Sequence, residues 1–253
     1  MERSPSTARP VAEDATGEAT LELFRENDAY TRFLWSRLSL LSPRPFEGSV
    51  LEVGCGIGNL TRILLGHAAV KRVKTIDMEP AYVARVLEQA GGDGRLEGET
   101  ARAEEYCPAA EAGAHDFIVS TNVIEHVEDH VRGLSNFHAL LAPGGIALVL
   151  VPAHPSLYSD LDRNLSHFRR YSRESLLDVS ARAGLDVLRM RHFNPLGAFG
   201  WWLNGKVLRR GMLPSGQLSL YTRFAIPISR LLDRWNPFPV GVSLIAALAR
   251  APR

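Results

Sequence analysis

The chain has 253 residues, of which 45% are hydrophobic and 23% are charged. This composition is typical of a globular protein, and the length allows one large domain with a sizeable core. Because the formal net charge is only +1, we expect no broad basic surface and no nucleic-acid partner. No stretch reaches about 18 uninterrupted apolar residues, so we expect no membrane span. The two cysteines, Cys55 and Cys107, are too few for a disulfide framework and favour a reducing, cytoplasmic compartment.

The first 17 residues are rich in Ser, Thr, Pro, Ala and charged side chains, and they lack the apolar centre of a signal peptide. We expect residues 1–17 to form a disordered tail and residues 18–253 to form a single domain. Among the 29 Lys and Arg residues, arginine strongly predominates, a bias typical of a GC-rich bacterial genome.

Hydrophobic periodicity predicts alternating strands and helices after an N-terminal helical cap at 18–45. We predict strands at 50–53, 70–77, 95–98, 115–122, 146–152, 185–193 and 241–250. We predict helices at 18–41, 59–67, 79–90, 128–141 and 172–184. Strands separated by single helices imply right-handed crossovers and an α/β, Rossmann-like, mostly parallel sheet with helices on both faces. The segment 241–250 could be a helix or a strand, and its shortness and position favour a last, edge strand.

Residues 194–239 lie between the last two predicted strands and contain three of the four tryptophans. An amphipathic pattern at 220–235 predicts a helix, which Pro227 would kink. We interpret 194–239 as a helical insertion that forms a lid, with Trp201 as a candidate substrate contact. Two alternatives stay open: additional core packed on the edge of the sheet, and attachment to a membrane surface through the Trp pair and the basic residues that follow it.

The sequence LEVGCGIGNLT at 51–61 places three glycines directly after an apolar run. A strand that passes through a glycine loop into a helix lets a ligand approach the backbone and the free N–H groups at the start of the helix. The loop follows G-x-G-x-G, whereas the dinucleotide-binding pattern G-x-G-x-x-G would need a glycine where Asn59 stands. The candidate ligand contacts of the loop are Gly54, Cys55, Gly56, Gly58 and Asn59. The Cys55 thiol is a packing group in this interpretation and no nucleophile.

Two acidic residues flank this loop. Asp77 lies 19 residues after Gly58, at the end of the second predicted strand. A carboxylate at that place can accept hydrogen bonds from both hydroxyls of a ribose, and the alternative is a simple turn residue. Glu52 directly precedes the loop, where a buried carboxylate needs a partner. It would either orient the loop or face the cationic end of a cofactor.

Four segments occur in order between residues 50 and 154: VLEVGCGIGNLT, TIDMEP, DFIVSTNVIEHVEDH and LLAPGGIALVLVPAH. Together they resemble the successive motifs of the class I S-adenosylmethionine-dependent methyltransferases. The resemblance implies a seven-stranded sheet whose last strand is antiparallel. It also implies S-adenosyl-L-methionine as the cofactor and S-adenosyl-L-homocysteine as the product.

The same resemblance assigns parts of the cofactor to residues of this chain. The glycine loop would pack against the methionine part, Asp77 would bind the ribose, and Met78 would lie against the adenine. Glu99, in the nearest match to the family's third motif, would face the adenine amine. Asn122 and Val123, at the end of the fourth predicted strand, would also face the cofactor.

His126 follows this cofactor-facing segment directly. Methyl transfer from a sulfonium is an in-line displacement, and an oxygen acceptor must also lose its proton. Histidine titrates near neutrality, which suits a base, and in the resembled family this position often points into the pocket. His126 is therefore our candidate catalytic base, and a structural or cofactor-orienting role is the alternative.

Residues 152–176 follow the end of the fifth predicted strand, the edge at which open α/β sheets bind ligands. This stretch is rich in aromatic and ionisable side chains and resembles one bacterial branch of the family, without identifying an acceptor. The candidate acceptor contacts are His154, Tyr158, His167, Arg169 and Tyr171. The alternative is that the residues at 169–171 form ion pairs and begin the next helix.

The histidines and carboxylates show no metal-ligand spacing along the sequence, so we expect no metal. The sequence predicts a methyltransferase for a small-molecule acceptor, with an oxygen of a bacterial secondary metabolite as the favoured target. One alternative is an enzyme that binds the cofactor but catalyses a cyclisation or rearrangement, because a cofactor site says little about the second substrate. Another is a methyltransferase for a lipid-linked acceptor that makes peripheral contact with a membrane.

Overall fold

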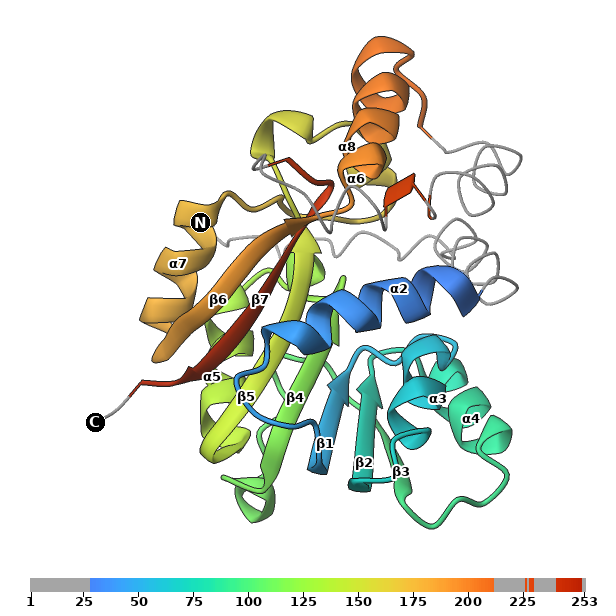
Figure 1. The fold of residues 1–253 in the computed structure, drawn as a ribbon, viewed down its shortest axis with the longest axis vertical. Coiled ribbons are helices and arrows are strands. Elements are labelled where there is room, and N and C mark those ends of the chain that lie inside the picture. The colour runs from blue at the N-terminus through green and yellow to red at the C-terminus, as the bar shows by residue number, and fades with distance from the viewer. Residues whose placement is uncertain (1–27, 212–225, 227, 230–239, 252–253) are drawn as a thin grey trace, which may run out of the picture.

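One seven-stranded sheet lies at the centre of the molecule (Figure 1). The structure is a computed structural model, and it describes residues 28–211, 226, 228–229 and 240–251. The predicted tail at 1–17 and the helix predicted at 220–235 fall wholly or largely outside these residues. The strands are β1 (Gly48–Val53), β2 (Val70–Asp77), β3 (Leu96–Thr100), β4 (His115–Thr121), β5 (Leu141–Pro152), β6 (Leu185–Phe193) and β7 (Ser243–Arg250).

The strand order is β3-β2-β1-β4-β5-β7-β6, and β1 to β5 pair in parallel. β7 runs antiparallel to both of its neighbours, which confirms the predicted direction of the last strand. Its predicted place at the edge is wrong, because β7 lies between β5 and β6. The first six residues of β7 are all buried, as expected of a strand covered on both faces. β6 alternates charged and apolar residues and forms the edge instead.

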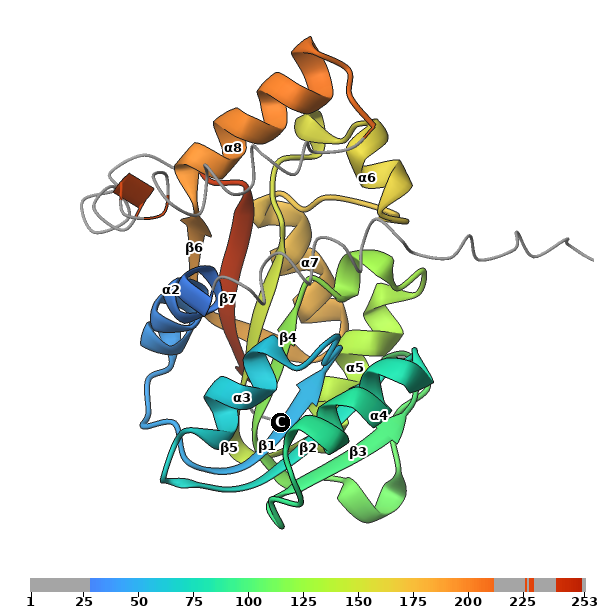
Figure 2. The same cartoon turned by 90° about the vertical axis from the view of Figure 1, so that its right-hand side faces the viewer.

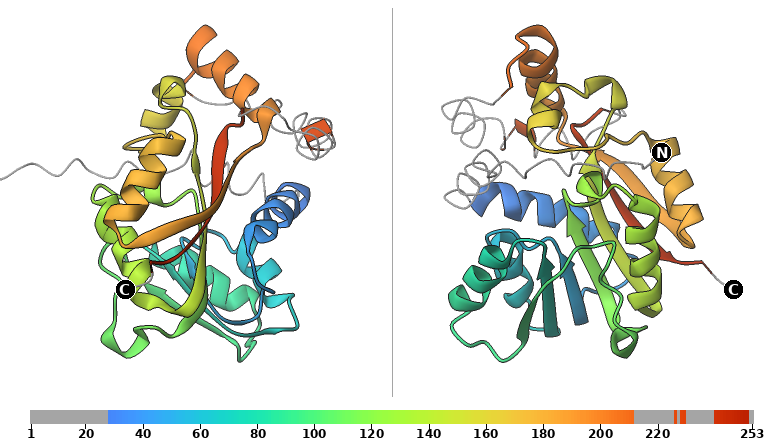
Figure 3. Two further views of the ribbon diagram at one scale, coloured as in Figure 1. Left: turned by 60° about the vertical axis from the view of Figure 1, so that its left-hand side comes forward. Right: turned by 180° about the vertical axis from the view of Figure 1, so that it is seen from behind.

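Helices cover both faces of the sheet, as predicted (Figures 1 and 3). One face packs against α2 (Asp28–Leu38), α3 (Asn59–Leu65) and α4 (Pro80–Gln89). The other face packs against α5 (His130–Leu140) and α7 (Arg173–Arg182). Side chains of successive residues in a strand point to opposite faces of the sheet. Phe117 and Val119 of β4 therefore pack in the core on the side of α2 and α3, and Ile118 packs in the core on the side of α5 and α7.

The carboxyl ends of the parallel strands point toward two further helices, α6 (Asp160–Asn164) and α8 (Pro195–Trp202) (Figure 2). A five-residue π-helix, Leu203–Val207, continues α8. In the described part of the chain, no helix is both long and apolar enough to cross a bilayer.

The chain leaves β1 toward β2 on one side and later returns to β4 on the other side of β1. The order of strands therefore reverses between β1 and β4. In open α/β sheets, ligands bind outside the carboxyl ends of the strands at this reversal. The glycine loop follows β1, and His126 follows β4, so the sheet brings the two predicted parts of the site to one place.

Candidate active site

Three glycines of the loop have a left-handed backbone conformation. The φ angles are +81° at Gly54, +49° at Gly56 and +85° at Gly58, a region that residues with a Cβ rarely occupy. A Cβ on Gly54 would overlap the side chain of Val123, which follows β4. The loop is thus bare of side chains on the side where the two strand ends meet.

Asp77 ties the glycine loop to the end of β2. One carboxylate oxygen accepts a hydrogen bond from the N–H of Gly56 at 2.9 Å, and the other accepts one from the N–H of Glu79 at 3.0 Å. Burial raises the pKa of Asp77, and these backbone donors act in the opposite direction. Each carboxylate oxygen has two lone pairs, so both can still accept a hydrogen bond from a ligand. Met78 beside it is exposed.

Glu52 is buried at the end of β1, directly before the loop. One of its oxygens accepts hydrogen bonds from the hydroxyls of Thr61 at 2.6 Å and Thr75 at 3.1 Å, which joins α3 to β2. Burial raises the pKa of Glu52 to about 7, against these hydrogen bonds. Both predicted roles of Glu52, orienting the loop and facing the cationic end of a cofactor, stay predictions.

The remaining loop residues divide between packing and exposure. Cys55 is buried against Val83 and Val86, and burial raises the pKa of its thiol. A thiol held neutral in this way is a packing group. Asn59 is the first residue of α3, so it lies at the end of the helix that carries free N–H groups.

Glu99 lies within β3. Its carboxylate forms an ion pair with Lys74 at 2.8 Å, and its backbone pairs in register with Ile76, one residue before β2 ends. After β3, the N–H of Ala101 donates to the carbonyl of Asp77 at 2.9 Å, and Arg102 follows it. The contact of Glu99 with the adenine amine stays a prediction.

The chain turns sharply after β4. Asn122 is exposed and has a φ angle of +54°, and its N–H donates to the carbonyl of Leu150 on β5 at 3.0 Å. A 3-10 turn, Ile124–His126, follows. It buries Ile124 and Glu125 and presents His126 beside them.

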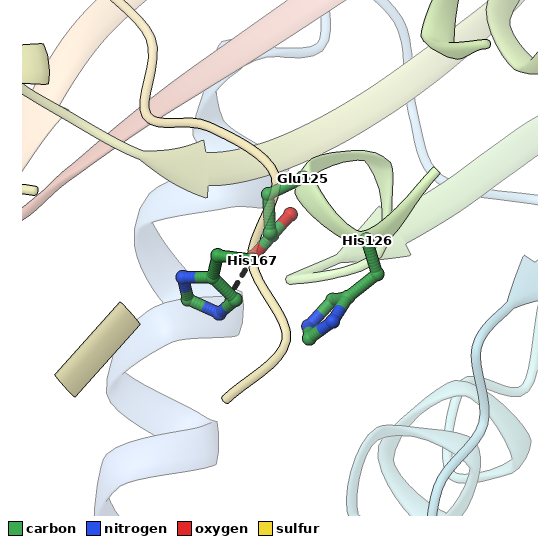
Figure 4. Close-up of side chains that lie close together, drawn as sticks. All are labelled: Glu125, His126 and His167. Carbon is green, nitrogen blue, oxygen red and sulfur yellow. Dashed lines mark ion pairs between the residues drawn. The ribbon is translucent and has the colours of Figure 1, made fainter. Parts of the chain in front are cut away.

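Glu125 and His126 form a cluster with His167, a residue from the loop after α6 (Figure 4). The donor atoms of the three side chains lie within 4.8 Å of one another. Burial raises the pKa of Glu125 to about 7 and lowers the pKa of His126 to about 4. His126 is thus uncharged at neutral pH and can accept a proton, although so low a pKa makes it a weaker base than an exposed histidine.

Asp162 supports His167 from the opposite side. The Nδ1 atom of His167 lies 3.0 Å from an Asp162 oxygen, and Arg170 donates to the same oxygen from Nε at 2.6 Å. The guanidinium of Arg170 lies 4.5 Å from the ring of Trp201, whose Nε1 donates to Asp162 at 3.3 Å. Trp201 therefore reaches the site through this network. Tyr158 also joins it, because its hydroxyl donates to the carbonyl of His167 at 2.7 Å.

Three of the predicted acceptor contacts have other partners. Arg169 donates to the carbonyls of Val127 at 2.6 Å and Glu128 at 2.9 Å, so its guanidinium holds the backbone. Tyr171 is buried in the core. His154 stacks on the ring of His192 at 5.0 Å. These placements favour supporting roles, in line with the alternative interpretation of 169–171.

Glu125 and Asp162 lie in segments that the sequence predicts to face the cofactor and the acceptor, but neither has a predicted role of its own, and Arg170 belongs to the stretch 169–171, for which ion pairs are the alternative. Glu125 directly precedes the predicted base, and Arg170 directly follows a predicted contact. A pattern of ligands along the chain could not reveal the cluster, because Glu125 and His167 come from separate turns that meet only in the fold. The sequence signal for Glu125 is an acidic residue between the apolar Ile124 and the predicted base.

Comparisons with known proteins agree with this geometry. Residues 24–190 match a family described as "Methyltransferase domain". The trans-aconitate 2-methyltransferase of Streptomyces avermitilis is 32% identical over 126 residues, which cover 48% of this chain and 46% of that protein. A Mycolicibacterium smegmatis protein described as a probable S-adenosylmethionine-dependent methyltransferase is 29% identical over 185 residues, which cover 72% of this chain and 69% of that protein.

A solved structure has the same fold. It is a methyltransferase in complex with the Haloferax volcanii Trm112 methyltransferase activator, and it superposes with a TM-score of 0.66 at 16% identity over 97% of this chain and 100% of the other. The chain spans about half the length of the trans-aconitate relatives that it matches. The family match, however, extends over more than half of this chain, from before α2 into β6. The chain therefore belongs to the class I S-adenosylmethionine-dependent methyltransferases.

Proposed function

We propose that this methyltransferase acts on an oxygen of a small molecule. The observation that carries the proposal is the position of the His126 imidazole just after the carboxyl end of β4, beside Asn122 and Val123. An oxygen acceptor has to lose a proton when its bond to the methyl carbon forms, and a neutral imidazole can take that proton. The relative that is named for trans-aconitate supports a small-molecule acceptor.

The residues at the carboxyl edge of the sheet fit S-adenosylmethionine. When bound, this cofactor supplies an activated methyl group on a sulfonium. The turns at Gly54 and Gly56 let a ligand contact the backbone, and a Cβ on Gly54 would close the loop against Val123. Asp77 offers free lone pairs to a pair of hydroxyls. These contacts support the predicted positions of the methionine and ribose parts.

The chain's own residues would then act by position. The loop and Asp77 fix one reactant, and the turn at Ile124–His126 holds the base near the strand reversal. In the described residues, α6 and α8 lie beyond this edge, where they can restrict the access of water (Figure 2). Orientation of this kind can account for several kcal/mol of a barrier, about 7–11 at most.

As the finer acceptor class, we propose a bacterial secondary metabolite. The predominance of arginine over lysine is typical of a GC-rich bacterial genome and supports a bacterial source. We place the reaction in the cytoplasm. Cys55 and Cys107 are both free thiols, in keeping with a reducing compartment.

The test is acceptor turnover followed by mass spectrometry. Wild-type protein, S-adenosylmethionine and a panel of hydroxy and carboxylic acids should yield S-adenosylhomocysteine and a methylated product in equal amounts. His126→Gln should lower kcat by about 10²–10⁴-fold and leave the affinity for S-adenosylhomocysteine unchanged. His67→Gln is the matched control, because His67 precedes β2 at the opposite edge of the sheet. Turnover of an acceptor without consumption of cofactor would instead identify a cyclisation or rearrangement.

A further inference from the structure

Three potential metal ligands converge at the turn after β4. Glu125 is fully buried, His167 is almost fully buried, and an oxygen of Glu125 lies 4.0 Å from Nε2 of His167. The rings of His126 and His167 meet edge to face, with centroids 4.7 Å apart. Figure 4 shows the three side chains directed toward a common space.

The partner of His167 determines which nitrogen is free. Asp162 can only accept at its ionised carboxylate, so the 3.0 Å contact places a proton on Nδ1 of His167. Nε2 then presents a lone pair to Glu125. A carboxylate that orients an imidazole from behind is the usual support of a histidine that binds a metal. Arg170 in turn holds Asp162 in its ionised form.

His126 is oriented in a similar way. Its ring hydrogen-bonds the backbone of Ser166, to which an imidazole N–H can donate. The other ring nitrogen therefore carries a lone pair.

Glu125 has no partner that explains its burial. Neither carboxylate oxygen accepts a hydrogen bond from another residue in the described part of the chain. A buried carboxylate without a partner is costly, and a bound cation would remove that cost. The two imidazole lone pairs and the carboxylate are all acceptors, so none of them can donate a hydrogen bond to another. Three acceptors that face one another are, however, suitable ligands for a cation.

We propose that Glu125, His126 and His167 bind one divalent transition-metal ion. Two imidazoles and one carboxylate suit Zn²⁺, Fe²⁺ or Mn²⁺, whereas Mg²⁺ prefers oxygen ligands alone. Ligands about 2.1 Å from a tetrahedral ion lie about 3.4 Å apart, so the Glu125–His167 pair needs to close by only a fraction of an ångström from 4.0 Å.

Backbone contacts hold the segment around His167 against the turn that carries Glu125. Ser166 has a φ angle of +58°, which turns the chain back toward the 3-10 turn. The N–H of Phe168 donates to the carbonyl of Glu125 at 2.9 Å, and the hydroxyl of Tyr158 holds the carbonyl of His167. The two ligand-bearing segments are therefore joined directly.

Three protein ligands leave at least one coordination position for water or an acceptor. With the ion bound, the free lone pair of His126 is taken by the metal, so His126 is a ligand and accepts no proton. On the proposed function, the open position would then take the oxygen of the acceptor and lower the pKa of its hydroxyl group, whose proton leaves to water. The site would thus select acceptors that can coordinate a metal through oxygen. This role rests on the proposed function, but the binding of the ion does not.

The test uses the metal alone. Full-length protein is dialysed against a chelator and titrated calorimetrically with ZnCl₂ and with MnCl₂, without cofactor or acceptor. We expect one ion per chain, weaker binding of Mg²⁺, and a higher melting temperature with the ion. Glu125→Gln and His167→Gln should weaken the binding by at least about 10-fold, and His67→Gln should leave it unchanged.

Glu125→Gln keeps the size of the side chain and removes its charge, so this variant decides the matter if His167→Gln fails to fold. A wild-type protein that takes up neither ion overturns the proposal, and Glu125 then keeps a proton instead. Equal binding by Glu125→Gln and the wild type also overturns it. Because no acceptor is present, either result leaves the proposed methyl transfer to be judged by its own assay.

Discussion

Asp77 accepts a hydrogen bond from the backbone N–H of Gly56 at 2.9 Å, although the two residues are 21 positions apart. This contact makes one carboxylate responsible for both the shape of the glycine loop and the proposed ribose contact. We expect Asp77→Ala to weaken the binding of S-adenosylhomocysteine by about 10–100-fold, since hydrogen bonds to a charged group contribute about 1.5–3 kcal/mol. Titration calorimetry measures the change.

Asp116 offers a matched control for this substitution. Its carboxylate also accepts a backbone hydrogen bond, from Ser49 at 2.9 Å, but at the opposite edge of the sheet. Asp116→Ala should therefore leave the affinity for S-adenosylhomocysteine unchanged. Equal losses in the two variants would mean that Asp77 acts only through the general stability of the sheet.

Alanine substitutions of Gly54 and Gly92 distinguish the effect of backbone strain from that of steric overlap. Both have a φ angle of +81°, but a Cβ on Gly54 would overlap Val123, whereas a Cβ on Gly92 would meet nothing within 4 Å. We expect Gly92→Ala to cost about 1 kcal/mol of unfolding free energy and to spare cofactor binding. Gly54→Ala should cost more and also displace Val123, so that cofactor affinity falls. Urea denaturation and calorimetry of both variants test this, and similar cofactor affinities would contradict it.

Glu52 predicts a dependence of stability on pH. Burial raises its pKa from 4.5 to about 7, so the folded protein keeps a proton that the unfolded chain has already released. The stability from this group is fully present below the unfolded pKa and is lost as the pH rises through about 7. A shift of this size corresponds to about 3 kcal/mol at most.

Glu52→Gln removes this titration and keeps an oxygen for the hydroxyl of Thr61. The variant should therefore lose less unfolding free energy than the wild type between about pH 5 and about pH 8. Urea denaturation at the two pH values gives the comparison. Glu97→Gln serves as the control, because Glu97 is exposed on β3. If the Glu52→Gln curve parallels that of the wild type, Glu52 titrates normally and is not buried as described.

The sequence allowed most of the fold to be predicted, because its strands are short apolar runs that end at glycines or charged residues. The place of β7 could not be predicted in the same way. Residues 241–250 follow a long insertion, and no local motif indicates which two strands of the sheet they join. The uninterrupted apolar run from Leu244 to Leu248 is the sequence signal for a central strand, since an edge strand rarely needs apolar residues on both faces.

The site was predicted unevenly for a similar reason. Gly54 and Asp77 belong to local motifs at strand ends, so their positions follow from the topology. The partners of His167 depend on the path of the loop after α6, and the left-handed Ser166 that sets this path has no sequence signal of its own. The cluster of Glu125, His126 and His167 is formed by two segments that are distant in the sequence, so it can be recognised only in the folded structure.

Tyr171 and Tyr158 provide the last test, because their hydroxyls serve different parts of the molecule. The hydroxyl of Tyr171 lies 2.8 Å from Nδ1 of His130 on α5, within the core, and makes only a long hydrogen bond, 3.4 Å, to the carbonyl of Ile124. Tyr171→Phe should therefore lower the unfolding free energy by about 1–2 kcal/mol and leave the KM for an acceptor unchanged. The hydroxyl of Tyr158 holds the carbonyl of His167. Tyr158→Phe should disturb the cluster at Glu125 and raise that KM, with a smaller effect on stability because Tyr158 is only half-buried. If Tyr171→Phe raised the KM at full stability, Tyr171 would contact the acceptor directly, as first predicted from the sequence.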